Sequence, residues 1–171
     1  MADGDYEGES HFFTDDVKLV TDLLNKNWHA EFGVVKPTIS YDKEGVMADS
    51  RYGKGYIFVY QVSRYNSVAS TDYGTLNRNS FVSVRISTRS REVMYAYMDE
   101  VYRILYDYRR AGMYRLNGYT HMEITSDNIE RGEIGWYTAS IDLKFTAYCY
   151  RIKSPGFGRP DEDWVKEVDN Q

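Results

Sequence analysis

The chain has little cysteine and little histidine, and both scarcities exclude classes of site. Cys149 is the single cysteine among 171 residues. One cysteine can form neither an intrachain disulfide nor a multi-cysteine metal site, so we interpret Cys149 as a small core residue of a strand. The histidines, His11, His29 and His121, are far apart in sequence, and none belongs to a close ligand pair. The sequence therefore predicts no metal site and no cofactor.

Long apolar runs are absent as well. No stretch approaches the ~18–20 apolar residues that a membrane span requires. The first 16 residues are acidic and contain no apolar segment of the kind found in signal peptides. We therefore expect a soluble intracellular protein, or part of an assembly built inside a cell, with no membrane partner.

Catalytic patterns are also missing. No Gly-x-Ser-x-Gly elbow occurs, and Gly156 and Gly158 are followed by neither a helix nor the Lys-Ser or Lys-Thr pair of a phosphate loop. Asp99 and Glu100 occupy adjacent positions of a predicted helix, which point apart, so we interpret both as solvated charges. The carboxylates at 161–163 lie in a predicted tail, where nothing would shift a pKa enough for acid–base chemistry. We predict that the chain is not an enzyme.

Tyrosine, by contrast, is abundant, with 17 Tyr against 7 Phe and 3 Trp. Its ring is apolar and its hydroxyl tolerates water, so it suits surfaces that are wet in a monomer and dry in a complex. Two predicted elements carry more apolar surface than one small domain needs: the alternating run 136–152, and the helical run 91–110 with five tyrosines around its circumference. Such elements are commonly covered by another copy of the chain. The alternative is a tyrosine-rich sheet that faces solvent.

The net charge of −5 is unevenly distributed. Residues 1–16 carry −6 and residues 153–171 carry −2, which leaves +3 for the residues between them. A dedicated nucleic-acid binder would show a stronger basic stripe. Five arginines nevertheless lie close in sequence with Asp72 as the single acidic residue among them: Arg64, Arg78, Arg85, Arg89 and Arg91. This cluster favours an acidic surface on a partner, or the chain's own acidic ends, with a nucleic-acid backbone as the alternative.

Periodicity predicts an α+β domain. The expected elements are a helix capped by Thr14 and ending near His29, strands at 38–41, 56–62 and 81–88, a helix at 91–110 capped by Ser90 and stopped at Gly112, and strands at 119–125 and 136–152. A long polar loop is expected at 63–79, and a polar turn at 126–135. We expect a mostly antiparallel sheet of about four to five strands with two helices on one face. The predicted divisions are a flexible acidic N-terminus (1–12), a single domain (13–152) and an extended acidic tail (153–171).

The order of these elements, together with two local patterns, resembles a known family. The sequence Thr-Arg-Ser-Arg-Glu stands at 88–92, and Val-Met-x-x-x-Met-x-x-Val-x-x-Ile-Leu follows at 93–105. A last hairpin then closes on the long alternating strand. Over residues 13–152 the chain resembles the tail terminator, or tail completion, proteins of tailed viruses, which include minor tail proteins that join the tail tube to the neck. The acidic extension 153–171, which contains Trp164, departs from that pattern.

The resemblance implies a small structural subunit of a virion, assembled in the host cytoplasm. Such a subunit forms a hexameric ring on the last ring of the tail tube and offers a surface to the head–tail connector or neck protein, with DNA only as cargo passing through. A ring of heterologous contacts needs two different complementary patches per subunit. For these subunit contacts the candidates are Tyr95, Tyr102, Tyr106, Trp136, Tyr148 and Tyr150. For docking to partners the candidates are Arg64, Tyr65, Tyr73, Arg78, Arg89, Arg91 and Trp164.

Two other functions stay open at the level of sequence. One is a tail tube or neck connector subunit of the same machine, for which a long loop that orders on stacking would favour the tube. The other is a monomeric cellular α+β module that binds a ligand. The second would require the tyrosines to line one concave cavity rather than two separate stripes.

Overall fold

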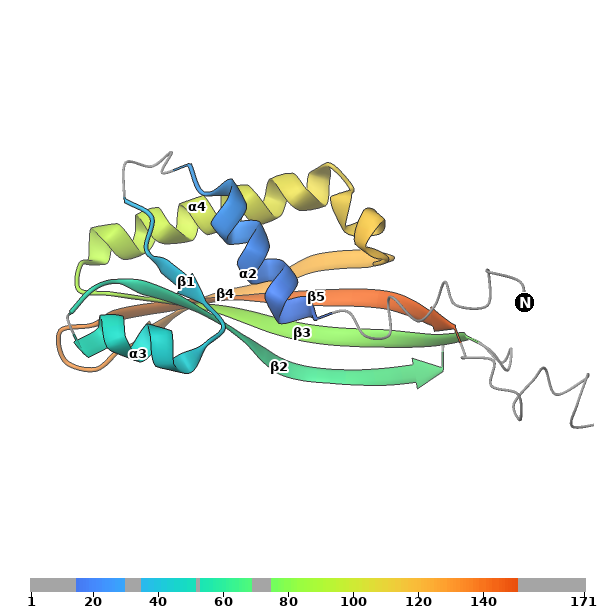
Figure 1. Cartoon of the computed structure of the whole chain (residues 1–171), viewed down its shortest axis with the longest axis horizontal. Helices are drawn as coiled ribbons and strands as arrows, with labels where there is room; N and C mark the ends of the chain where they lie inside the picture. The colour runs from blue at the N-terminus through green and yellow to red at the C-terminus, as the bar shows by residue number, and fades with distance from the viewer. Residues whose placement is uncertain (1–14, 30–34, 52, 69–74, 151–171) are drawn as a thin grey trace, which may run out of the picture.

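The computed structural model describes residues 15–29, 35–51, 53–68 and 75–150. Its elements are α2 (Asp16–Asn27), β1 (Thr38–Ser40), α3 (Lys43–Arg51), β2 (Tyr56–Val68), β3 (Thr75–Thr88), α4 (Arg91–Arg110), the 3-10 helix η2 (Met113–Asn117), β4 (His121–Arg131) and β5 (Tyr137–Tyr150). The strands form one sheet in the order β1-β2-β3-β5-β4 (Figure 1). Only the short β1–β2 pair is parallel among these neighbours. The predicted α+β class with a mostly antiparallel sheet is confirmed.

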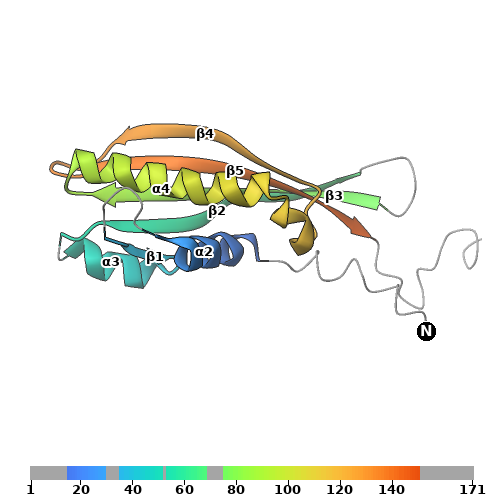
Figure 2. The ribbon, with the colours of Figure 1, turned by 90° about the horizontal axis from the view of Figure 1, so that it is seen from above.

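The core lies between the sheet and two helices. Alternation turns one side of each central strand inward, so that Ile57 of β2, Val84 of β3 and Ile141 of β5 are fully buried. These residues pack in one cluster with Leu24 of α2 and Leu105 of α4. The two helices therefore cover the same face of the sheet, and Figure 2 shows α4 running alongside one part of it.

The helix α4 has the predicted bounds because its ends are marked by strong local signals. The Ser90 Oγ accepts a hydrogen bond from the Val93 amide at 3.4 Å and so satisfies one free donor of the first turn. Beyond the last turn, Gly112 adopts a φ of 69°, a left-handed conformation that glycine tolerates without strain.

The helix α2 begins one residue later than predicted. Its N-cap is Asp15 rather than Thr14, because the Asp15 carboxylate accepts a hydrogen bond from the Lys18 amide at 3.0 Å. A carboxylate at this position also complements the positive end of the helix dipole. Thr14 lies outside the described residues.

The predicted long loop at 63–79 is wrong for most of its length. β2 continues to Val68 and β3 begins at Thr75, and the two strands pair through polar residues such as Asn66 and Arg78. Hydrophobic alternation could not reveal this pairing, because the segment contains few apolar side chains to alternate. In Figure 1 these ends of β2 and β3 extend beyond α2 and α4.

The last hairpin also differs from the prediction. β4 continues to Arg131, whereas the predicted strand ended at Thr125 and a turn filled 126–135. The actual turn is short and contains Gly135 at a φ of 83°. β4 is an edge strand, and its second half faces solvent. Polar residues are therefore tolerated there while the backbone stays paired to β5.

The helix α3 was not predicted at all. It is nine residues long and includes Gly45, which disfavours a helix interior. Its buried residue Val46 lies outside the main core cluster. α3 lies beside Tyr56 and Phe58 of β2. The alternate residues of that strand, Ile57 and Val59, point into the core under α2 and α4. α3 therefore packs on the opposite face of the sheet.

Candidate interaction surfaces

The sheet face opposite α2 and α4, which we call the open face, carries a stripe of aromatic rings. Phe58 and Tyr60 of β2 stack at 5.5 Å between ring centroids with an interplanar angle of 21°. A bulge follows them in β2, after which Tyr65 stacks on Phe81 of β3 at 6.1 Å. Among the described elements only α3 packs on this face, and it covers one end. The sequence contained the signal for this stripe, since aromatic residues alternate with core residues through β2.

Four small hydroxyl side chains on the open-face side of β3 and β5 are buried. Ser83 and Ser87 of β3 and Thr138 and Ser140 of β5 are all less than 5% exposed. The Ser87 and Thr138 oxygens are 3.5 Å apart, whereas the Ser83 hydroxyl has no hydrogen-bond partner within the described part of the chain. A sheet face with packed rings and buried hydroxyls is unlike the solvated face of an ordinary two-layer domain.

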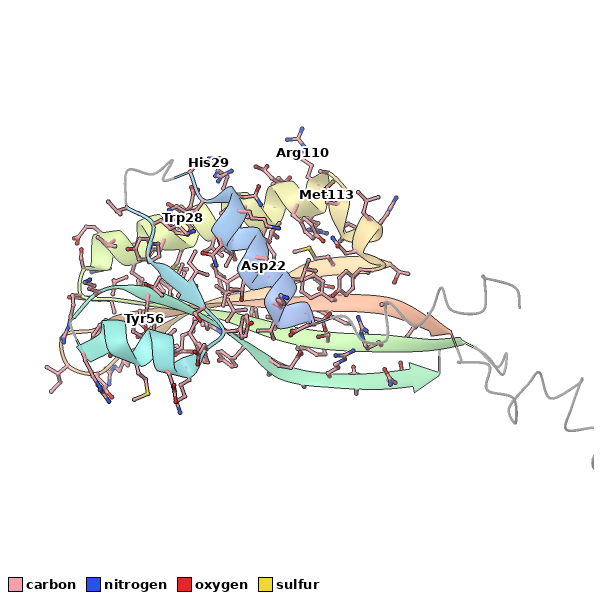
Figure 3. The ribbon with its side chains drawn as sticks, viewed as in Figure 1. Asp22, Trp28, His29, Tyr56, Arg110 and Met113 are labelled. Atoms are coloured by element: carbon pink, nitrogen blue, oxygen red, sulfur yellow. The ribbon has the colours of Figure 1, made fainter. Side chains whose placement is uncertain are left out.

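The end of the open face nearest α3 is hollowed into a cup. One wall is α3, the floor is formed by β2, β3 and β5, and the other wall is the turn from β4 to β5. The lining residues are Lys43, Val46, Met47, Ser50, Tyr56, Phe58, Arg85, Ser87, Arg131, Gly132, Glu133, Trp136 and Thr138. Figure 3 shows Tyr56 beside α3. The cup has a volume of about 400 Å³.

Trp136, a predicted subunit contact, forms part of this cup. Its ring lies 5.9 Å from the ring of Tyr56, and the Arg89 guanidinium stacks over it at 4.2 Å. Arg89 also donates a hydrogen bond to the Gly135 carbonyl at 3.2 Å. Arg89 was predicted to dock a partner, and in the structure it holds the β4–β5 turn and the Trp136 ring in place.

A second surface is a groove between α4 and the edge strand β4. Tyr95 and Tyr102, two predicted subunit contacts, line it together with Met98, Asp99, Asp127, Asn128 and Ile129. The Asp127 carboxylate lies close to Tyr102, and the pKa of Tyr102 is raised by burial first and by that negative charge second. The free edge of β4 runs beside this groove, and an unpaired edge is a template for pairing with another chain. Tyr106 lies exposed further along α4, outside the groove.

Arg78 does not belong to a docking surface, which corrects its predicted role. Its side chain is 2% exposed and pairs with the buried Asp16 of α2 at 3.4 Å. The Tyr119 hydroxyl donates a hydrogen bond to the same Asp16 oxygen. Burial, followed by the Asp16 charge, raises the pKa of Tyr119 well above its usual range. The three residues join α2, β3 and the segment before β4.

Glu100 also differs from its prediction as a solvated charge. It is fully buried and accepts hydrogen bonds from the His29 amide at 2.9 Å and from Arg103 at 2.7 and 3.2 Å. Arg103 donates in addition to the Asn27 carbonyl at 2.8 Å. This clasp ties the end of α2 to the middle of α4, and Figure 3 shows His29 at that end.

The remaining predicted docking residues do not form one basic patch. Arg64 and Tyr65 lie on the extended part of β2, whereas Arg91 lies at the start of α4, near the opposite end of β3. Tyr73 and Trp164 lie outside the described residues. Tyr148 and Tyr150 belong to the end of β5, where the structure describes the backbone but not the side chains.

The chain matches no family model and no curated protein sequence. Within the described ranges, no three His, Cys, Asp or Glu side chains converge as metal ligands would. None of the described helices combines the length and the apolar character needed to cross a membrane. The geometry of the open face and of the groove is therefore the basis for a functional interpretation.

Proposed function

We propose that the chain is a structural subunit that assembles with copies of itself into a ring. The observation that carries this proposal is the stacked aromatic stripe on the open face, which only α3 partly covers among the described elements. Helices normally bury one face of such a sheet, and the other face is then polar. Here the other face carries stacked aromatic rings that are only partly buried, with Tyr65 52% exposed, and apolar surface of that kind indicates a protein interface.

The groove beside β4 supports a ring rather than a closed dimer. It lies next to the free edge of the sheet and on the side of α4, whereas the open face lies on the opposite side. A ring of identical subunits joins two different surfaces of each copy, and a two-fold dimer joins one surface to itself. The chain offers two different surfaces.

Combined with the resemblance to tail terminator and tail completion proteins, these surfaces favour a specific role. In that role six copies form a ring that caps the tail tube of a virion and joins it to the head–tail connector or neck protein, and DNA passes through the ring as cargo. Among the described tyrosines, Tyr56 lines the cup on one side of the sheet, and Tyr95 and Tyr102 line the groove on the other. This separation disfavours a monomeric ligand-binding module.

Light scattering on the purified chain, with electron micrographs of the same peak, tests the proposal. A ring of about six copies with a central hole is the expected result. Long stacked tubes would favour a tail tube subunit instead. A strict monomer at all concentrations would contradict self-assembly.

Two exposed tyrosines provide a matched pair of variants. Tyr65 on the open face is 52% exposed, and Tyr41, which follows β1 and lines neither the cup nor the groove, is 51% exposed. We expect Tyr65→Ser to weaken the ring by removing a stacked aromatic contact, about tenfold or more in the association constant. Tyr41→Ser should leave the ring intact. Equal effects of the two substitutions would remove the open face from the interface.

A further inference from the structure

The cup at the end of the open face has the chemistry of a binding site for an acidic segment that contains a large aromatic residue. Tyr56, Phe58 and Trp136 give it aromatic surfaces, and its volume of about 400 Å³ lies within the range of sites that hold one ligand-sized group. Buried aromatic anchors in pockets of this kind carry much of the energy of protein interfaces.

The charge around the cup is mainly positive. Lys43, Arg85 and Arg131 line it, against Glu133 as the acidic lining residue. Arg85 also pairs with Glu130 at 3.4 Å, a contact exposed enough to exchange for another carboxylate. The cup therefore favours an occupant with several negative charges around an aromatic side chain.

The chain itself contains one such segment. Residues 161–167 read Asp-Glu-Asp-Trp-Val-Lys-Glu, with four acidic residues and one lysine around Trp164. We propose that the cup of one copy binds the segment 161–167 of a neighbouring copy, with Trp164 against the aromatic surfaces and the carboxylates facing Lys43 and Arg131. This inference rests on the proposed self-assembly and names one of its contacts.

Chain length favours a neighbouring copy over the chain's own tail. The cup lies beside Thr138 at the start of β5, and the strand carries the chain about 40 Å away from it by Tyr150. The 14 residues from Tyr150 to Trp164 span at most about 50 Å when fully extended. A return within one chain would need a nearly straight tail, which carries a large entropic cost. The cup of a neighbouring copy can lie closer to the end of β5 and be reached by a bent tail.

Disulfide trapping between two differently labelled full-length chains tests the proposal. Both chains carry Cys149→Ser, which removes the only natural cysteine. One carries Met47→Cys in the cup, and the other carries Asp163→Cys in the segment. Because the two cysteines are on different chains, a disulfide between them can form only across copies. The measurement is the yield of the mixed disulfide by mass spectrometry under mild oxidation.

Met113→Cys is the matched control for the cup, because Met113 is 44% exposed and Met47 is 47% exposed. We expect the yield from Met47→Cys to exceed that from Met113→Cys about tenfold. Adding Arg131→Glu to the cup chain should lower the yield about tenfold, because a repulsive charge replaces an attractive one. Adding Asp161→Arg to the segment chain should then restore part of it.

Three results would overturn the proposal. One is equal trapping at Met47→Cys and Met113→Cys, and another is no mixed disulfide at all. The third is a disulfide that forms only within a single chain carrying both Met47→Cys and Asp163→Cys, which would assign the cup to the chain's own tail. Rings in light scattering without the mixed disulfide would refute the tail contact and leave self-assembly standing, whereas monomers would refute self-assembly itself.

Discussion

At the scale of single residues, burial separates two ion pairs of equal length. Arg78–Asp16 and Arg85–Glu130 both have a nitrogen–oxygen distance of 3.4 Å. The first pair is buried, with exposed side-chain fractions of 2% and 0%, and the second is 46% and 41% exposed. A buried charge that loses its partner has no water to solvate it, so the loss is costly. An exposed charge that loses its partner is solvated by water, so the loss costs little.

We therefore predict that Arg78→Ala destabilises the fold far more than Arg85→Ala. Removing the partner of a buried charge costs about 3–5 kcal/mol, and breaking an exposed pair costs less than about 1 kcal/mol. Urea unfolding of the two variants measures both free energies. Similar losses in the two variants would show that the Asp16 carboxylate is not held by Arg78.

The sequence could not predict this pair, although it predicted other single residues well. Ser90 was recognised as a cap because a cap acts within one turn of its own helix. Arg78 contacts Asp16 across 62 positions, and only the tertiary fold brings α2 over β3. Arg78 was assigned to a surface patch because other arginines lie near it in sequence. The sequence alone did not show that the fold would bury Arg78 against Asp16.

At the scale of elements, the clasp between α2 and α4 holds the end of a short helix. The final carbonyls of α2 have no partner within the helix, and Arg103 supplies a charged donor to the Asn27 carbonyl. Glu100 holds Arg103 in place and also accepts from the His29 amide. The clasp thus combines helix capping with packing between helices.

We predict that Glu100→Ala loosens the end of α2. The substitution removes the acceptor of His29 and leaves Arg103 without its buried carboxylate, at a cost of about 3 kcal/mol. Hydrogen exchange should become faster in the last turn of α2 and change little in the centre of α4.

Asp107→Ala is the control for this prediction. Asp107 pairs with the same Arg103 at 3.6 Å but is 61% exposed, so its loss should leave exchange in α2 unchanged. Equal acceleration by both variants would mean that the general charge environment of Arg103, rather than the buried clasp, holds α2.

Elements with strong periodicity were predictable, and polar elements were not. The bounds of α4 follow from its apolar stripe and its caps. The second halves of β2 and β4 were missed because their strand conformation comes from pairing with neighbours and not from their own side chains. α3 was missed for a related reason, since Val46 is its sole buried apolar side chain among those described.

At the scale of the whole molecule, the sequence revealed a surplus of aromatic surface but not where it lies. The surplus was predicted on the helix at 91–110 and on the outward side of the last strand. The structure places Tyr95 and Tyr102 of the helix in the groove and Trp136 in the cup of the open face. The stacked stripe with Tyr65, by contrast, comes from β2 and β3 and was not predicted as a subunit contact. Which face of a strand is inward depends on where the helices pack, and a period of two leaves that choice open.

The buried tyrosines make a further prediction for the molecule as a whole. The pKa values of Tyr97, Tyr108 and Tyr119 are raised, in each case by burial first. In the unfolded chain a tyrosine loses its proton near pH 10. Above about pH 10 the unfolded chain therefore releases protons that the folded chain keeps, so the free energy of unfolding falls as pH rises.

We predict that the free energy of unfolding falls steeply in alkaline solution, by up to about 1.4 kcal/mol per pH unit for each of these tyrosines. Urea unfolding at several values between about pH 9 and pH 11 measures the slope. Tyr119→Phe should lower stability near neutral pH, because Asp16 loses a buried donor, and should make the alkaline slope shallower by about one proton. A slope that is unchanged in this variant would show that Tyr119 ionises alike in the folded and unfolded chains, and that its burial against Asp16 does not hold its proton.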